Sequence, residues 1–208
     1  MILTPIPPHQ LPALLDRFAA SLDDGFALTA FRRLARRDDA ERAAGDAALR
    51  HHEQALGVLT QLGMGHCPGA PRDGFSWDGA AARRDTEAYV LLHEAAHFQL
   101  AAPERRRRID FGLGPGPETG DRAAAMAAAS VFGLECEREE AMASLLGILW
   151  EAALGQPALA SFLDQNWCEA AGRRSAAAHF QGILDALRRD GLIDAQGYPR
   201  LRLRHGPE

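Results

Sequence analysis

A pair of histidines inside an apolar segment constrains this chain more than any other feature. Residues 89–100 read YVLLHEAAHFQL and contain the pattern H-E-x-x-H, with His93 and His97 as its two ends. The other residues of the segment are apolar on nearly every side, which predicts a buried helix. Asp85 or Thr86 can cap its start, and Pro103 follows its end. Residues four apart in a helix share a face, so the two imidazoles should project together.

Two imidazoles at this spacing can bind one cation. Neutral imidazole is a ligand for zinc, iron, copper and nickel. Glu94 lies beside the pair and can act as a catalytic residue on a group bound to the cation. The structural alternative is a hydrogen-bonded pair in the core, since an unpaired buried polar group costs about 1–3 kcal/mol. We predict a metal site that contains His93 and His97, with Glu94 as its catalytic residue.

The third ligand is expected from an acidic stretch further along the chain. Residues 135–140 read ECEREE and precede a long apolar run. Glu135 and Glu139 lie one helical turn apart and share a face, so we predict that one of them is a metal ligand. Asp110 is the next candidate. The alternative is a solvated acidic turn that nearby arginines neutralise.

Those arginines form the run 105–108, which is RRRR. Four consecutive residues cover every face of a helix or turn, so some of them must face solvent. We expect this run to attract an acidic substrate or protein partner near the site. A solvated basic turn is the alternative.

Composition excludes several functions. All 23 basic residues are arginine, so the chain has no lysine for Schiff-base chemistry. The net charge of −5 gives no indication of nucleic-acid binding. No apolar run could span a membrane and no signal peptide is apparent, so we expect a cytoplasmic protein. The three cysteines are widely spaced and form no C-x-x-C pair, which makes a zinc ribbon or redox pair improbable.

Hydrophobic periodicity predicts a mainly α fold with at most a minor β-sheet, in a single metal-binding domain that covers residues 1–208. An extended Pro-rich lead is expected over residues 1–10. Helices are expected, besides the central one, at residues 11–20, 38–62, 122–135, 157–171 and 173–189. We expect residues 26–37 to change from strand to helix, and residues 198–204 to form an edge strand.

The loop at residues 63–79 is rich in Gly and Pro and leads directly into the central helix. Loops of this length are often functional, so it could cover the site. His66 lies in this loop and is expected to be solvated rather than a ligand. Trp167 and His179, near the end of the chain, are expected in the core.

The order of the motifs resembles that of the elongation factor P hydroxylase family. His93-Glu94-x-x-His97-Phe98 is followed by the arginine run, by Asp110-Phe111-Gly112, by a Pro/Gly loop and by Phe132 with glutamates. In that family an aromatic residue, an R-R pair and a D-F-G-Y stretch follow H-E-x-x-H. Here Phe98 replaces the usual tryptophan, and the aromatics after Gly112 are missing. The resemblance covers residues 87–154 and implies a cytoplasmic, iron-dependent, oxygen-using hydroxylase that acts on a modified lysine of elongation factor P.

The ligand set alone leaves alternatives open. Two histidines and one carboxylate bind Fe(II) in non-haem oxygenases, and the same set with Zn(II) and Glu94 as general base describes a metallopeptidase. A dinuclear centre in a helical bundle ranks lower, since only one E-x-x-H pair occurs. A non-enzymatic protein whose fold is stabilised by a metal would need four protein ligands, and the sequence offers no clear fourth ligand. A peptidase normally holds its substrate along an edge strand, which residues 63–79 do not supply convincingly. We therefore predict an iron-dependent monooxygenase with a protein substrate, and a zinc peptidase as the alternative.

Overall fold

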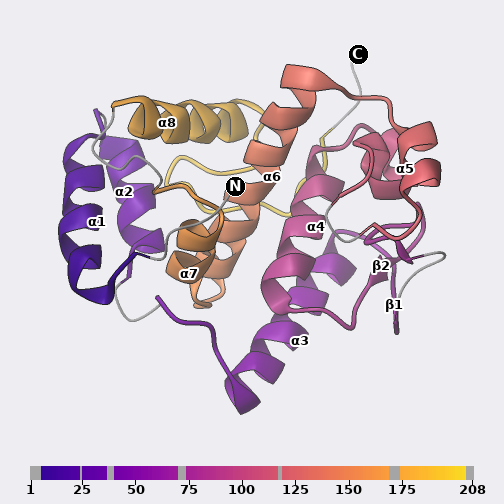
Figure 1. Ribbon diagram of the computed structural model, residues 1–208, viewed down its shortest axis with the longest axis horizontal. Helices are drawn as coiled ribbons and strands as arrows, with labels where there is room; N and C mark the ends of the chain where they lie inside the picture. The colour runs from indigo at the N-terminus through magenta and orange to yellow at the C-terminus, as the bar shows by residue number, and fades with distance from the viewer. Residues whose placement is uncertain are drawn as a thin grey trace.

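The computed structural model describes residues 6–23, 25–36, 40–69, 74–116, 119–168 and 174–204, and these form eight α-helices and one small sheet (Figure 1). The helices are α1 (Leu11–Ala20), α2 (Gly25–Leu34), α3 (Gly45–Gln61), α4 (Ala88–Leu100), α5 (Arg122–Ala128), α6 (Gly133–Ala153), α7 (Ala158–Asp164) and α8 (Arg174–Arg189). The prediction of a mainly α fold with a minor sheet is confirmed. No helix in the described ranges has both the length and the apolar character needed to cross a membrane.

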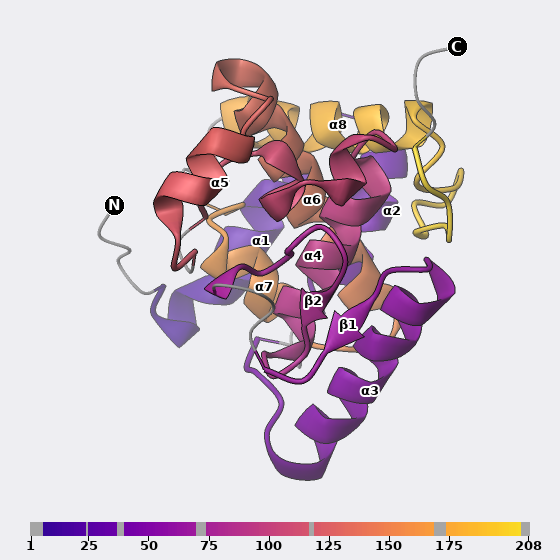
Figure 2. The ribbon, with the colours of Figure 1, turned by 90° about the vertical axis from the view of Figure 1, so that its right-hand side faces the viewer.

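Helices α4 and α6 lie side by side at the centre of the fold. In Figure 1, α1, α2, α7 and α8 lie on one side of α6, and α4, α5 and the sheet lie on the other. Figure 2 shows α3 extending below the sheet. Four phenylalanines, one each from α1, α2, α7 and α8, join those helices with ring centroids 4.8–6.2 Å apart: Phe18, Phe31, Phe162 and Phe180.

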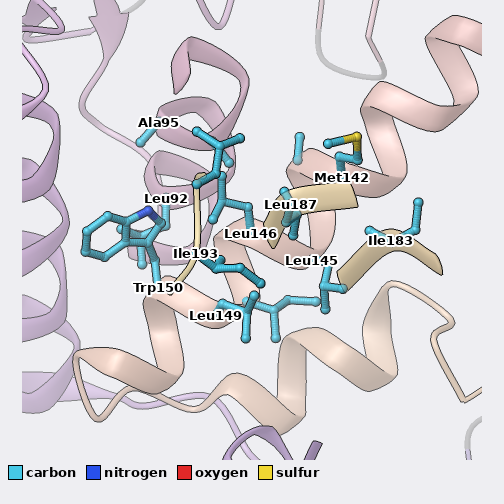
Figure 3. Close-up of a cluster of buried hydrophobic side chains, with 14 of the residues drawn as sticks. Leu92, Ala95, Met142, Leu145, Leu146, Leu149, Trp150, Ile183, Leu187 and Ile193 are labelled. Atoms are coloured by element: carbon cyan, nitrogen blue, oxygen red, sulfur yellow. The ribbon is translucent and has the colours of Figure 1, made fainter. Parts of the chain in front are cut away.

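The interface between α4 and α6 is fully apolar at its centre. Leu92 and Ala95 of α4 lie near Leu146 of α6, and all three are buried (Figure 3). Gly147 allows the two helices to approach closely, because a Cβ at this position would lie 3.2 Å from the Cα of His93. That separation is tighter than side chains ordinarily tolerate, so any larger residue would push the histidine helix away.

The sheet has two strands of two residues each. Strand β1 (His66–Cys67) pairs in parallel with β2 (Ala82–Arg83), with His66 opposite Ala82. Residues 74–81, which precede β2, are not simply a solvated loop, because Phe75 and Trp77 are buried. Part of the loop that we expected to cover the site, residues 63–79, is therefore packed into the fold.

Several helix limits differ from the predicted ones. Residues 25–34 are helical throughout, so the predicted strand at the start of 26–37 is wrong. Helix α3 begins only at Gly45 rather than at residue 38, and residues 38–39 of that prediction lie outside the described part of the chain. Helix α7 ends at Asp164, before the predicted residue 171.

The ends of α4 and of the chain also differ from expectation. Helix α4 begins after Glu87 without a side-chain cap, since Asp85 pairs with Arg83 and Thr86 donates to Glu87. Residues 198–204 form one bridge, Pro199 with Ile193, in place of an edge strand.

Candidate metal centre

The two histidines of the H-E-x-x-H motif lie together, as their spacing predicts. Nε2 of His97 lies 3.0 Å from Nε2 of His93, and the ring planes are nearly perpendicular. His97 is buried, whereas His93 keeps 27% of its side chain exposed. The pair therefore presents both Nε2 atoms to one place that solvent can reach.

The carboxylate that joins this pair is Glu140. Its Oε2 atom lies 3.5 Å from Nε2 of His97 and 3.9 Å from Nε2 of His93. His93, His97 and Glu140 form a group whose donor atoms all lie within 4.8 Å of one another. No further His, Cys, Asp or Glu joins this group in the part of the chain that the structure describes.

The structure places Glu140 beside the histidines, and neither of the predicted third ligands, Glu135 or Glu139, lies in this group. Glu135 is exposed in the first turn of α6. The carboxylate of Glu139 accepts two hydrogen bonds from Arg105, at 2.6 and 2.7 Å. Successive helical residues are rotated by about 100°, so Glu140 points to a different neighbour from Glu139.

The spacing of Glu140 and Gly147 in the sequence could have identified Glu140. Glu140 precedes Gly147 by seven residues, which is about two helical turns, so both lie on one face of α6. Gly147 is the residue that contacts the backbone of His93. A glycine inside an apolar helical run often marks a close helix approach. The glutamate two turns before it was the better candidate.

The distances suit a shared cation. Zinc and iron bind nitrogen and oxygen ligands at about 2.0–2.2 Å, so two ligands of one ion lie at most about 4.4 Å apart. The three measured separations are 3.0, 3.5 and 3.9 Å. A hydrogen bond between the two Nε2 atoms would use the lone pair of only one of them. A bound cation would use the lone pairs of both. The residues present therefore fit a metal ion.

Electrostatics favour the metal-binding protonation states of His93 and Glu140. Burial and the neighbouring His97 lower the pKa of His93 to about 3, so this imidazole is neutral at pH 7. Burial alone would raise the pKa of Glu140, but the hydrogen bond and charge of His97 lower it to about 2. Burial alone would lower the pKa of His97, but Glu140 reverses this and raises it. A neutral His93 and an ionised Glu140 are the forms that bind metals.

An unusual turn holds the side chain stacked on His97. Asp110, Phe111 and Gly112 have φ angles of 43°, 54° and 71°, so three consecutive residues adopt the left-handed conformation. The ring of Phe111 stacks between Trp77 and His97, with centroids 5.5 and 5.6 Å away. Nδ1 of His97 is buried and has no hydrogen-bond partner among the described residues, so packing fixes this imidazole. Left-handed non-glycine residues are strained and cluster at functional sites.

Arg105 ties this turn to α6. Besides its two bonds to Glu139, its Nε atom donates to the carbonyl of Phe111 at 3.0 Å. The guanidinium of Arg105 thus links Glu139, which precedes the candidate ligand, to Phe111, which stacks on His97. Buried bidentate arginine–carboxylate pairs fix geometry well.

The basic run, which we expected to attract an acidic substrate or partner, is largely engaged within the fold. Arg105 is occupied by Glu139, and Arg106 donates to the carbonyls of Phe98 and Arg204. Arg107 and Arg108 are exposed, and Arg108 reaches the carbonyl of Ala128. Three of the four arginines thus form hydrogen bonds within the fold.

The remaining sequence-based candidates lie around the site rather than in it. Asp110 accepts a hydrogen bond from Thr119 at 2.9 Å, and burial raises its pKa although that bond opposes the effect. His66 is half-buried and does not join the histidine group. Trp167 is buried as predicted, but His179 is exposed, so the prediction that it lies in the core is wrong.

A cavity of about 250 Å³ opens beside the centre. Three carboxylates line it, from Glu94, Asp110 and Glu140, together with His93 and His97. None of its described lining residues is an arginine. We call it the acidic cavity.

Comparisons of the chain with protein-family models, with curated proteins and with solved structures find no match. The assignment of a function therefore depends on the site itself.

Proposed function

We propose that this chain is a mononuclear non-haem iron enzyme that uses dioxygen to hydroxylate a lysine-derived side chain on a protein partner such as elongation factor P. The observation that carries the proposal is the group of His93, His97 and Glu140, which has no fourth protein ligand among the described residues. Two histidines and one carboxylate with open positions are the ligand set of non-haem Fe(II) oxygenases. A structural metal would instead be closed by four ligands.

Bound iron would supply the activation of dioxygen, and the chain supplies the rest. His93, His97 and Glu140 would hold the ion. Glu94 lines the same cavity, so its carboxylate can take up or return a proton at a group bound there. Phe111 and Trp77 cover one side of His97 with aromatic surface, which excludes water from that side.

The charge of the acidic cavity favours a cationic substrate. Glu94, Asp110 and Glu140 bring three negative charges when ionised, and a divalent ion would offset two of them. One carboxylate charge would remain, which suits the ammonium group of a lysine-derived side chain. Asp110 is the best candidate to pair with this ammonium group, since Glu140 would bind the metal.

A zinc peptidase is the second candidate, and Glu94 is the observation that favours it. A glutamate next to the first histidine of H-E-x-x-H is the general base of such enzymes. These enzymes normally also hold an extended substrate against an edge strand. In the described ranges the strands have two residues each, and neither lines the acidic cavity. This difference ranks the hydroxylase first.

The test loads metal-free protein with ferrous iron or with zinc and supplies lysine-modified elongation factor P, dioxygen and ascorbate. We expect the iron form to add one oxygen atom to the modified lysine, while the second oxygen atom is reduced to water by ascorbate. The zinc form should be inert, and His93→Ala should serve as the metal-free control. Cleavage of peptide bonds by the zinc form, without a gain of oxygen by the iron form, would reverse the order of the two candidates.

A further inference from the structure

A second cavity adjoins the metal centre and has no part in the function proposed so far. Its volume is about 440 Å³, and among the described lining residues it shares only His93 and Glu140 with the acidic cavity. Its other walls come from α6, from residues 165–167 just after α7 and from α8, whereas the acidic cavity is lined mainly by α4, residues 110–116 and Thr119. Figure 1 shows α7 and α8 on the side of α6 that faces away from α5. His93 and Glu140 thus form the boundary between two compartments.

The chemistry of the second cavity differs from that of the acidic one. Glu140 is the only carboxylate among its described lining residues, which otherwise offer neutral polar groups from Ser144, Gln165 and Asn166. Trp167 donates its indole N–H to the hydroxyl oxygen of Ser144 at 2.7 Å, so the hydroxyl proton of Ser144 can be donated elsewhere. The side-chain amides of Gln165 and Asn166 each offer both donors and an acceptor.

The aromatic part of this cavity is flat. The ring of His179 stacks on Trp167 with centroids 5.3 Å apart and planes 15° apart, and His179 is exposed. A volume of this size lies within the range of about 300–1,000 Å³ that ligand sites typically have. The acidic cavity is below that range, so it suits a single side chain rather than a whole ligand.

We propose that the second cavity binds the neutral amide groups of the peptide segment that carries the substrate side chain. The side chain would enter the acidic cavity, and the flanking peptide groups would pair with Ser144, Gln165 and Asn166. Peptide groups offer one donor and one acceptor each, which matches a hydroxyl and two carboxamides. A substrate bound on both sides of His93 and Glu140 passes directly over the metal ligands. This inference rests on the proposed function, because it assigns a binding place to the peptide groups that flank the substrate side chain at that same site.

The test compares two probes by calorimetry on zinc-loaded protein. n-Butylamine carries only a cation, and N-acetyl-glycyl-lysyl-glycine amide carries the same cation with peptide groups on both sides. We expect the peptide to bind about tenfold more tightly than butylamine, because one or two net hydrogen bonds contribute about that factor. Ala176→Phe, which fills the second cavity from α8, should remove this advantage. Ala178→Phe is the matched control, since Ala178 is exposed on the same helix and does not line the cavity.

Ala141→Leu supplies a second variant from α6, in case phenylalanine at position 176 disturbs the fold. The inference is overturned if the peptide and butylamine bind equally to the unmodified chain. It is also overturned if whichever of the two cavity variants folds leaves the peptide advantage intact. Failure of the proposed function has a different signature, which is the lack of an oxygen-dependent mass gain whatever the two probes do.

Discussion

Helix α6 carries a carboxylate cluster near each of its ends, and the two clusters obtain their positive partners differently. Near the start, Glu140 lies beside two histidines, and 49% of its side chain is exposed. Near the end, Glu151 is 2% exposed, accepts a hydrogen bond from Ser161 and lies 3.5 Å from the guanidinium of Arg42. The pKa of Glu140 is lowered to about 2 by His97, whereas burial raises that of Glu151 to about 7.

The difference shows which cluster can take an ion from outside the chain. At the far end, Arg42 also pairs with Asp164 and stacks on the ring of Tyr89, so the chain supplies its own cation. At the near end, the chain supplies the neutral imidazole of His93 beside His97 and leaves the carboxylate accessible. A neutral imidazole beside an accessible carboxylate could hold a metal ion, whereas a carboxylate closed by arginine is a structural cluster.

Removing either histidine beside Glu140 should have the largest effect of all these changes, namely the loss of bound metal. We expect His93→Ala and His97→Ala each to lose stoichiometric metal, because one of three protein ligands is gone. Arg42→Met at the far end is the control and should keep its metal. Elemental analysis of protein purified without added metal measures both, and full occupancy in either histidine variant would contradict the comparison.

Breaking the pair of Arg105 and Glu139 should have the next largest effect. Arg105→Met leaves the carboxylate of Glu139 buried without its partner, which typically costs about 3–5 kcal/mol of unfolding free energy. Replacing both residues by methionine should recover most of that loss, since no unpaired charge remains. Urea unfolding of the metal-free proteins measures both values. Equal destabilisation of the single and double variants would show that the unpaired charge is not the cause.

The raised pKa of Glu151 predicts a smaller, pH-dependent effect. Its folded pKa lies above the unfolded value, so its stabilising contribution is present in acid and is lost as pH rises towards 7. Between pH 5 and pH 7 this loss should be about 2 kcal/mol, and Glu151→Gln should abolish it. The measurement is the difference between wild-type and variant unfolding free energies at each pH, which cancels the opposite contribution of His93. A difference that does not change with pH would refute the assignment.

Local spacing was sufficient to predict the central helix and its two histidines. The rule that residues four apart share a face needs no knowledge of the rest of the fold. The choice among Glu135, Glu139 and Glu140 could not be made in this way, because it depends on the rotation of α6 against α4. The contact of Gly147 with the backbone of His93 sets that rotation.

Other features had no local signature at all. The four arginines are identical in sequence, and only the tertiary fold decides that Arg105 turns inward to Glu139. Asp110 and Phe111 adopt left-handed backbones, which an aromatic residue such as Phe111 rarely does, so no local pattern predicts this turn. The alternating residues at 198–204 suggested a strand, but the side chain of Gln99 binds the carbonyls of Arg200 and Arg202. A single glutamine thus takes the hydrogen bonds that a neighbouring strand would need.

The central claim is that Glu140 completes a metal centre with His93 and His97. The most direct test is the metal content of Glu140→Gln, with Glu135→Gln as a matched variant five residues earlier on the same helix. We predict one metal ion per chain in the wild type and in Glu135→Gln, and a loss of stoichiometric metal in Glu140→Gln. Full occupancy in Glu140→Gln, or loss in Glu135→Gln alone, would contradict this account of the site.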